Sequence, residues 1–143
     1  ADLIFADWVL EHIDDPAAFA AEVGRTLKPG GWFCARTPNR WGYIGLATNL
    51  VPNRLHTAVL KKTQPGRKER DVFPTRYRMN TRGALRRVFP ADRYEVVVYG
   101  VNSEPAYFGS SLLLWRLAQL MFRLTPPSLE AQLLIFVRKK SLS

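Results

Sequence analysis

The stretch that decides the fold reads Ala1-Asp-Leu-Ile-Phe-Ala-Asp-Trp-Val-Leu-Glu-His-Ile-Asp-Asp-Pro16 and continues to Leu27-Lys-Pro-Gly-Gly31. Residues 3–9 form a short apolar run with little alternation, which is typical of a strand in a parallel sheet covered on both faces. Asp15 and Pro16 predict a helix start, and Gly30-Gly31 predicts its exit. A second apolar run at residues 32–37 completes a βαβ unit, which predicts two neighbouring parallel strands.

The remainder of the chain continues the alternation of helices and strands. Residues 38–79 are less regular and carry a run of basic side chains between Arg54 and Arg78. After this run, the pattern predicts a helix capped by Asn80-Thr81 and a strand at residues 94–101. A leucine-rich helix at residues 110–124 and a final strand at residues 131–137 follow. This order predicts an α/β layer protein.

The opening stretch resembles the middle of a class I S-adenosylmethionine-dependent methyltransferase of the type 11 kind. Residues 1–12 are similar to the fourth strand of that family and the turn after it. Residues 27–31 match the Leu-Lys-Pro-Gly-Gly that ends the next helix, and residues 37–39 match the Thr-Pro-Asn that ends the fifth strand. The resemblance implies the C-terminal half of a seven-stranded Rossmann-like sheet, strands four to seven, with flanking helices, an insert after the fifth strand and an antiparallel last strand.

The resemblance also divides the chain. Residues 1–38 are expected to form a strand-helix-strand core, residues 39–79 a basic insert or lid, and residues 80–143 a helix, strand, helix and strand. The family's glycine-rich loop belongs to its N-terminal half, and the sequence contains no Gly-x-Gly-x-Gly. We therefore expect an N-terminal cofactor-binding half as a missing partner, an exposed edge on the first strand, and no activity from this part alone.

The cofactor that the resemblance implies is S-adenosylmethionine. In open α/β sheets, ligands bind outside the carboxyl ends of the strands, where the strand order reverses. In this family that point borders the end of the first strand seen here, so the cofactor-binding candidates are Ala6, Asp7, Trp8 and Leu10. For Trp8, a place in the core is the alternative.

Glu11 and His12 follow directly, and three interpretations stay open. His12 is a candidate catalytic general base. The pair could instead contribute to a divalent-metal site, but Trp8 stands where some quinone O-methyltransferases have a further acidic ligand, so we expect no metal. In the third interpretation, the two residues only finish the strand and contact the next loop.

The insert supplies the candidate contacts to the acceptor substrate. These are Trp41, Tyr43, His56, Tyr77 and Arg78. The acceptor expected from the resemblance is a small or lipid-like molecule. The basic run could hold its phosphate or carboxylate groups, which would make it anionic. The alternatives are a solvated basic face and an ordinary surface histidine at position 56.

The net charge of +9 favours an acidic substrate, a membrane surface or nucleic acid. No nucleic-acid-binding motif is present, so no specific nucleic acid is expected. The single cysteine, Cys34, excludes an internal disulfide and fits a reducing cytoplasm. The helix at residues 110–124 is expected to pack on the sheet or, as the alternative, to meet a membrane peripherally. Two other functions stay open: a noncatalytic module that binds nucleic acid or anionic membrane, and a degenerate partner subunit of a methyltransferase.

Overall fold

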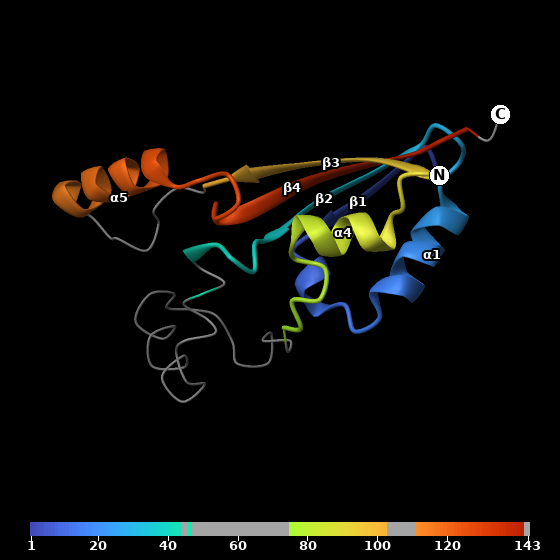
Figure 1. Ribbon diagram of the computed structural model, residues 1–143, viewed down its shortest axis with the longest axis horizontal. Helices are drawn as coiled ribbons and strands as arrows, with labels where there is room; N and C mark the ends of the chain where they lie inside the picture. Colours follow the sequence, from blue (N-terminus) through green and yellow to red (C-terminus); the bar gives the residue numbers. More distant parts are fainter. Residues whose placement is uncertain (44–45, 47–74, 103–110, 142–143) are drawn as a thin grey trace.

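The computed structural model describes residues 1–43, 46, 75–102 and 111–141 (Figure 1). Within these residues the chain alternates strands and helices. The elements are β1 (Leu3–Asp7), the 3-10 helix η1 (Leu10–His12), α1 (Pro16–Thr26), β2 (Trp32–Pro38), α4 (Arg82–Val88), β3 (Tyr94–Val101), α5 (Leu112–Leu124) and β4 (Gln132–Lys139). The α/β class and the order of the predicted elements are confirmed. The first strand ends at Asp7 and not at Val9. Of the predicted basic insert, His56 and the charged residues from Arg54 to Asp71 lie outside the described residues.

The described strands form one mixed sheet in the order β1-β2-β4-β3. β1 and β2 are parallel, with Ala6 opposite Ala35, as the βαβ pattern predicts. β4 lies between β2 and β3 and is antiparallel to both, which confirms the expected direction of the last strand. Because β3 opposes β4, it runs in the same direction as β1 and β2. The carboxyl ends of β1, β2 and β3 therefore meet at one edge of the sheet, which we call the carboxyl edge.

Local chemistry fixes the ends of the helices. The Asp15 carboxylate accepts hydrogen bonds of 3.0 Å from the amides of Ala17 and Ala18, so it is the predicted cap of α1. Gly30 has a φ of 79°, a left-handed conformation that glycine adopts without steric cost, and it leads the chain into β2. The Thr81 hydroxyl accepts from the Ala84 amide at 3.1 Å and caps α4 in the same way.

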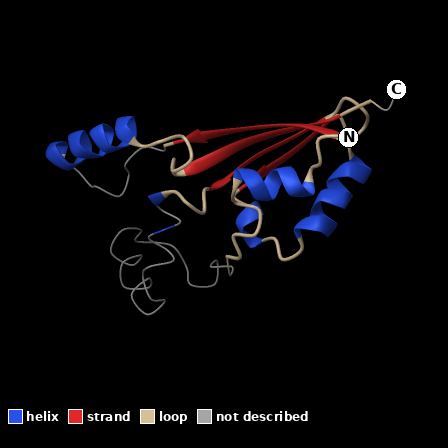
Figure 2. Cartoon of the chain, viewed as in Figure 1, coloured by secondary structure: helices blue, strands red, loops and turns tan. Residues whose placement is uncertain are grey.

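The core lies between one face of the sheet and the two helices α1 and α4, which Figure 2 shows on the same side of the strands. Phe33 of β2 is fully buried at its centre. Its ring centroid lies 5.8 Å from that of Phe19 in α1 and 5.8 Å from that of Phe89 just after α4. Such aromatic contacts tie both helices to the sheet.

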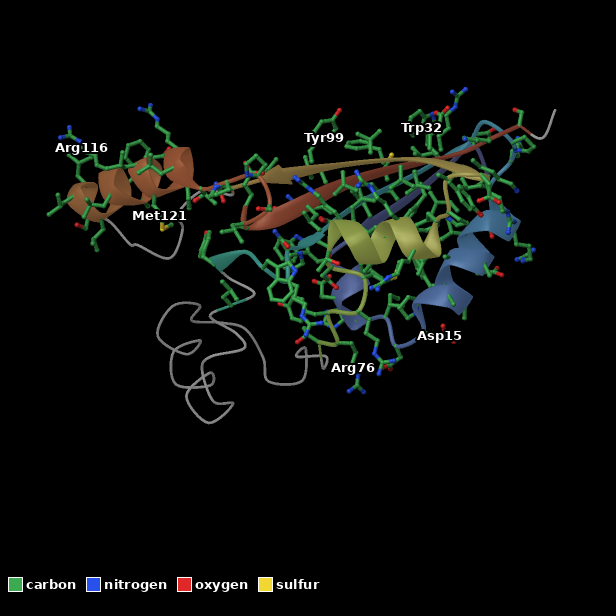
Figure 3. The ribbon with its side chains drawn as sticks, in the orientation of Figure 1. Asp15, Trp32, Arg76, Tyr99, Arg116 and Met121 are labelled. Carbon is green, nitrogen blue, oxygen red and sulfur yellow. The ribbon has the colours of Figure 1, made fainter. Side chains whose placement is uncertain are left out.

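The opposite side of the sheet is not covered by the described residues. Its large apolar side chains, here called the open sheet face, are Leu3, Phe5, Trp32, Val97 and Tyr99. Phe5 has 68% of its surface exposed. Figure 3 shows Trp32 and Tyr99 on the side away from α1 and α4. The expectation that the first strand is buried on both faces is therefore wrong for this chain, because both covering helices lie on one side.

The leucine-rich helix α5 also departs from expectation. It does not cover the sheet but extends beyond the carboxyl edge, next to the end of β3 (Figure 1). Among the described residues, Phe122 contacts the rest of the protein, because its ring stacks on Tyr43 at 5.7 Å and its carbonyl accepts from the Asn102 side chain at 3.3 Å. Ala118, which is 4% exposed, lies near the same side of the helix. In the part of the chain that the structure describes, no helix has both the length and the apolar character required to cross a bilayer.

Candidate functional site

The carboxyl end of β1 holds the first group of candidate site residues. The Trp8 amide donates to the Arg36 carbonyl at 3.0 Å, which continues the pairing with β2 by one residue. Trp8 then adopts a φ of 55°, a left-handed conformation that is uncommon for a residue with a side chain. This turn takes the chain out of the sheet and into η1. Backbone strain of this kind is frequent at functional sites.

Asp7, Arg36 and Trp8 form one cluster at this end. Asp7 and Arg36 are opposite each other in the register, and their side chains pair through two hydrogen bonds, Nε–Oδ1 at 2.7 Å and Nη2–Oδ2 at 2.8 Å. The hydrogen bonds from Arg36 lower the pKa of Asp7, and the carboxylate raises the pKa of Arg36. The guanidinium carbon also lies 5.6 Å from the centre of the Trp8 ring. The ring of Trp8 is 39% exposed, so a ligand at this end of the sheet could reach it.

A buried polar network lies behind this cluster. Glu11, 4% exposed, accepts a hydrogen bond of 3.0 Å from the Thr37 hydroxyl. The side-chain amide of Asn80 donates to that hydroxyl at 2.6 Å and to the Pro38 carbonyl at 3.0 Å. The network joins η1, the end of β2 and the residue before the Thr81 cap. The carboxylate of Glu11 is therefore directed into the protein.

Residues 76–78, which precede α4, make hydrogen bonds to η1 and to the residues just after it. The Glu11 carbonyl accepts from the amides of Arg76 at 2.6 Å and Tyr77 at 3.2 Å. The Arg78 side chain donates to the Asp14 carbonyl at 2.5 Å, and Arg76 pairs with the Asp14 carboxylate at 2.8 Å. The backbone at Tyr77 has a φ of 52°. Tyr77 and Arg78, predicted as acceptor contacts, are thus brought to the loop that carries His12.

His12 itself ends η1. It is half-buried, and its amide donates to the Val9 carbonyl at 3.0 Å. Among the residues that the structure describes, no three His, Cys, Asp or Glu side chains are grouped as metal ligands would be. Ala6 and Leu10, the remaining cofactor candidates, belong to the core, and the side chain of Leu10 is fully buried. Their part in cofactor binding stays a prediction.

Trp41 and Tyr43 lie beyond the end of β2, toward β4 and away from β1. Asn39 binds the chain before β4 through bonds of 2.9 Å to the Ser128 carbonyl and 2.8 Å to the Glu130 carbonyl. Trp41 follows this anchor, is 52% exposed and has the Arg40 guanidinium 5.7 Å from its ring centre. Tyr43 stacks on α5. The structure therefore bonds Tyr77 and Arg78 to Glu11 and Asp14, on either side of His12, but places Trp41 and Tyr43 on the β4 and α5 side of the molecule.

Three site residues were missed by the sequence analysis: Arg36, Thr37 and Asn80. Thr37 lies in a motif that was noticed only for its resemblance, and Asn80 was interpreted only as part of a helix cap. Arg36 carries a signal that could have been used. A charged residue in an otherwise apolar strand usually faces an opposite charge, and Asp7 ends the neighbouring strand.

Comparison with known proteins gives a family match over the first part of the chain. Residues 1–35 match the family model described as a methyltransferase domain. No curated protein matches the chain. The matched residues are β1, η1, α1 and the first part of β2, so they include the Trp8 turn and His12. The match supports a class I S-adenosylmethionine-dependent methyltransferase-like domain, which is the family that the opening stretch resembles.

Proposed function

We propose that this protein takes part in S-adenosylmethionine-dependent methyl transfer to a small or lipid-like acceptor. The observation that carries the proposal is the coincidence of two findings. The family match covers the β1-α1-β2 unit, and this unit presents an exposed aromatic ring on a strained turn at the carboxyl edge. That edge is where open α/β sheets bind their ligands.

The residues at this edge fit one side of a cofactor site. The exposed ring of Trp8 offers a flat apolar surface on which an adenine could stack. The Asp7–Arg36 pair holds the neighbouring charges in a fixed arrangement. The cofactor supplies a methyl group on a sulfonium, which is already activated for displacement. The protein then has to align the acceptor with that methyl group, and only a weak nucleophile such as a hydroxyl needs a base.

For such a base, His12 is the candidate that the structure favours over Glu11. The Glu11 carboxylate is directed into the buried network with Thr37, whereas His12 lies half-buried on the loop that Tyr77 and Arg78 reach. We propose that His12 removes the acceptor proton, and that Tyr77 and Arg78 help to position the acceptor.

A further part of the proposal is that a second half-domain completes the cofactor site. β1 pairs only with β2 among the described strands, so its other edge is free to continue the sheet. Three more strands would complete the seven-stranded sheet that the resemblance implies. The glycine-rich loop that they carry would face the Trp8 turn. We place this activity in the cytoplasm.

The test uses the longest native product that contains this chain, with S-adenosylmethionine titrated calorimetrically. Trp8→Ala is expected to weaken cofactor binding by about tenfold, since a base stacked on an aromatic ring contributes about 1–3 kcal/mol. Trp41→Ala is the matched control, because this exposed tryptophan lies on the other side of β2, and its cofactor affinity is expected to stay unchanged. Unchanged affinity in both Trp8→Ala and Asp7→Ala would contradict the placement of the cofactor.

A second measurement separates catalysis from binding. His12→Ala is expected to reduce turnover by about 10²–10⁴-fold, the usual contribution of a general base, while cofactor affinity stays close to that of the wild type. Normal turnover would leave His12 with a purely structural role at the end of η1.

A further inference from the structure

Helix α5 carries several large apolar side chains that are mostly exposed to solvent. Leu113 and Leu124 have 68% and 73% of their surface exposed, and Leu117 and Leu120 have 54% each. Together with Met121 we call these residues the α5 apolar face. Contiguous apolar patches of this kind on a protein surface usually mark an interaction site.

The α5 apolar face is continuous along the helix. At about 100° per residue, its five members fall within an arc of roughly 100°. Ala118 and Phe122, which hold the helix to the rest of the protein, lie on a different side. The far end of the α5 apolar face forms a shallow depression with Thr125 and Pro126. The helix is therefore anchored on one side and presents a separate apolar side.

The charges beside this face identify the kind of partner. Arg116 and Arg123 are seven residues apart in the sequence, so they lie within about 20° of each other around the helix, along one border of the α5 apolar face. Figure 3 shows Arg116 on the opposite side of the helix from Met121. No Asp or Glu occurs from residue 111 to residue 129. A helix that carries an apolar face with arginines at its border is typical of helices that lie in an anionic lipid surface.

We propose that α5 docks this protein onto an anionic lipid bilayer, lying in the plane of the interface. The leucines of the α5 apolar face would enter the boundary between headgroups and acyl chains. The two arginines would keep their charged ends at the lipid phosphates, as long basic side chains do at interfaces. With the carboxyl edge beside α5, a docked protein would meet acceptors that reside in the membrane. The docking itself does not depend on the proposed methyl transfer.

The test measures cosedimentation of the full chain with vesicles of phosphatidylcholine, with and without phosphatidylglycerol. We expect binding to the anionic vesicles and at least tenfold weaker binding to the neutral ones. Leu120→Glu with Leu124→Glu is expected to reduce the partition coefficient on anionic vesicles by at least tenfold. Arg116→Gln with Arg123→Gln is expected to weaken the preference for anionic over neutral vesicles.

The matched control introduces the same two charges on an exposed part of α1, as Ala17→Glu with Ala21→Glu. This variant is expected to bind like the wild type, and circular dichroism and urea unfolding check that all variants are folded. Absence of wild-type binding to anionic vesicles would overturn the proposal. Equal losses in the α5 and α1 variants would also overturn it, because net charge alone would then account for binding. A wild-type dimer that Leu120→Glu with Leu124→Glu dissociates, without vesicle binding, would assign the face to a second copy of the chain.

Discussion

Asp7 and Arg36 are the residues on which the geometry of the candidate site depends most directly. They end neighbouring parallel strands, their side chains pair through two hydrogen bonds, and the guanidinium also faces the Trp8 ring. Both side chains keep more than a third of their surface exposed, so solvent screens the pair. Its main effect is to hold the turn at Trp8, with a modest contribution to stability.

The stability of this pair should depend on pH. Because the pKa of Asp7 is lowered in the folded protein, its contribution is present above the unfolded value of about 3.8 and is lost as the pH falls through the folded value. Asp7→Asn is expected to reduce the free energy of unfolding by less than about 1 kcal/mol at pH 7. Urea unfolding of both proteins at pH 7 and near pH 3 measures this. A difference that is no smaller near pH 3 than at pH 7 would contradict an ionic role for the pair.

At the scale of single residues, sequence patterns predict where a residue lies in its element better than they predict which side chains it bonds. Trp8 and His12 lie beyond the carboxyl end of β1, as expected from the strand that precedes them, and their roles in a site stay predictions. The bonds of Thr37 to Glu11 and Asn80 could not be predicted, because they join residues 26 and 43 positions apart in the sequence. Such contacts depend on the register of the sheet and on the path of the chain into α4.

Among the elements, the turn that follows β2 packs closely against other backbone. A Cβ on Gly42 would lie 2.7 Å from the Glu130 carbonyl oxygen and 2.8 Å from the Ala131 Cα. Neither atom can move away without shifting the start of β4. This close approach holds residues 39–42 against the chain that enters the central antiparallel strand.

Gly42→Ala is therefore expected to destabilise the protein by about 1–3 kcal/mol, the usual cost of overpacking a tight contact. Gly83→Ala is the matched control, because a Cβ there meets nothing within 4 Å and lies in the first turn of α4. It is expected to leave stability unchanged or raise it by up to about 1 kcal/mol. Thermal or urea unfolding gives both values. Equal effects of the two substitutions would show that the contact at Gly42 relaxes.

The helices show where local sequence is sufficient. Asp15, Thr81 and Ser111 cap α1, α4 and α5 through their own side chains, so each helix start follows from the residues around it. The position of α5 did not follow in this way. Its leucines predict an apolar surface, but the sequence does not state whether that surface meets the sheet or another partner.

At the scale of the whole molecule, the sheet has one covered and one uncovered side. α1 and α4 bury Phe33 completely on one side, whereas Phe5 is 68% exposed on the other. The two phenylalanines lie on adjacent strands, one residue apart in the register. They differ mainly in which side of the sheet they face.

This difference in burial predicts that alanine substitutions of the two phenylalanines have unequal effects on stability. Phe33→Ala is expected to cost about 3–5 kcal/mol, as deletion of a buried ring does, whereas Phe5→Ala is expected to change stability by less than about 1 kcal/mol. Urea unfolding of the full chain measures both. A large loss for Phe5→Ala would mean that the open sheet face is covered in solution.

The sequence by itself predicted the elements and their order, because capping residues, glycine exits and apolar periodicity act over a few residues. Its opening stretch also resembles the methyltransferase-like domain that the family match supports. It also placed the candidate site at the end of the first strand. Only the tertiary structure decided that β4 enters between β2 and β3, that Arg36 pairs with Asp7, that Glu11 is directed inward, and that α5 and the open sheet face stay exposed. These features depend on strand register and on the sides of the sheet that the helices cover, which are set by contacts between residues far apart in the chain.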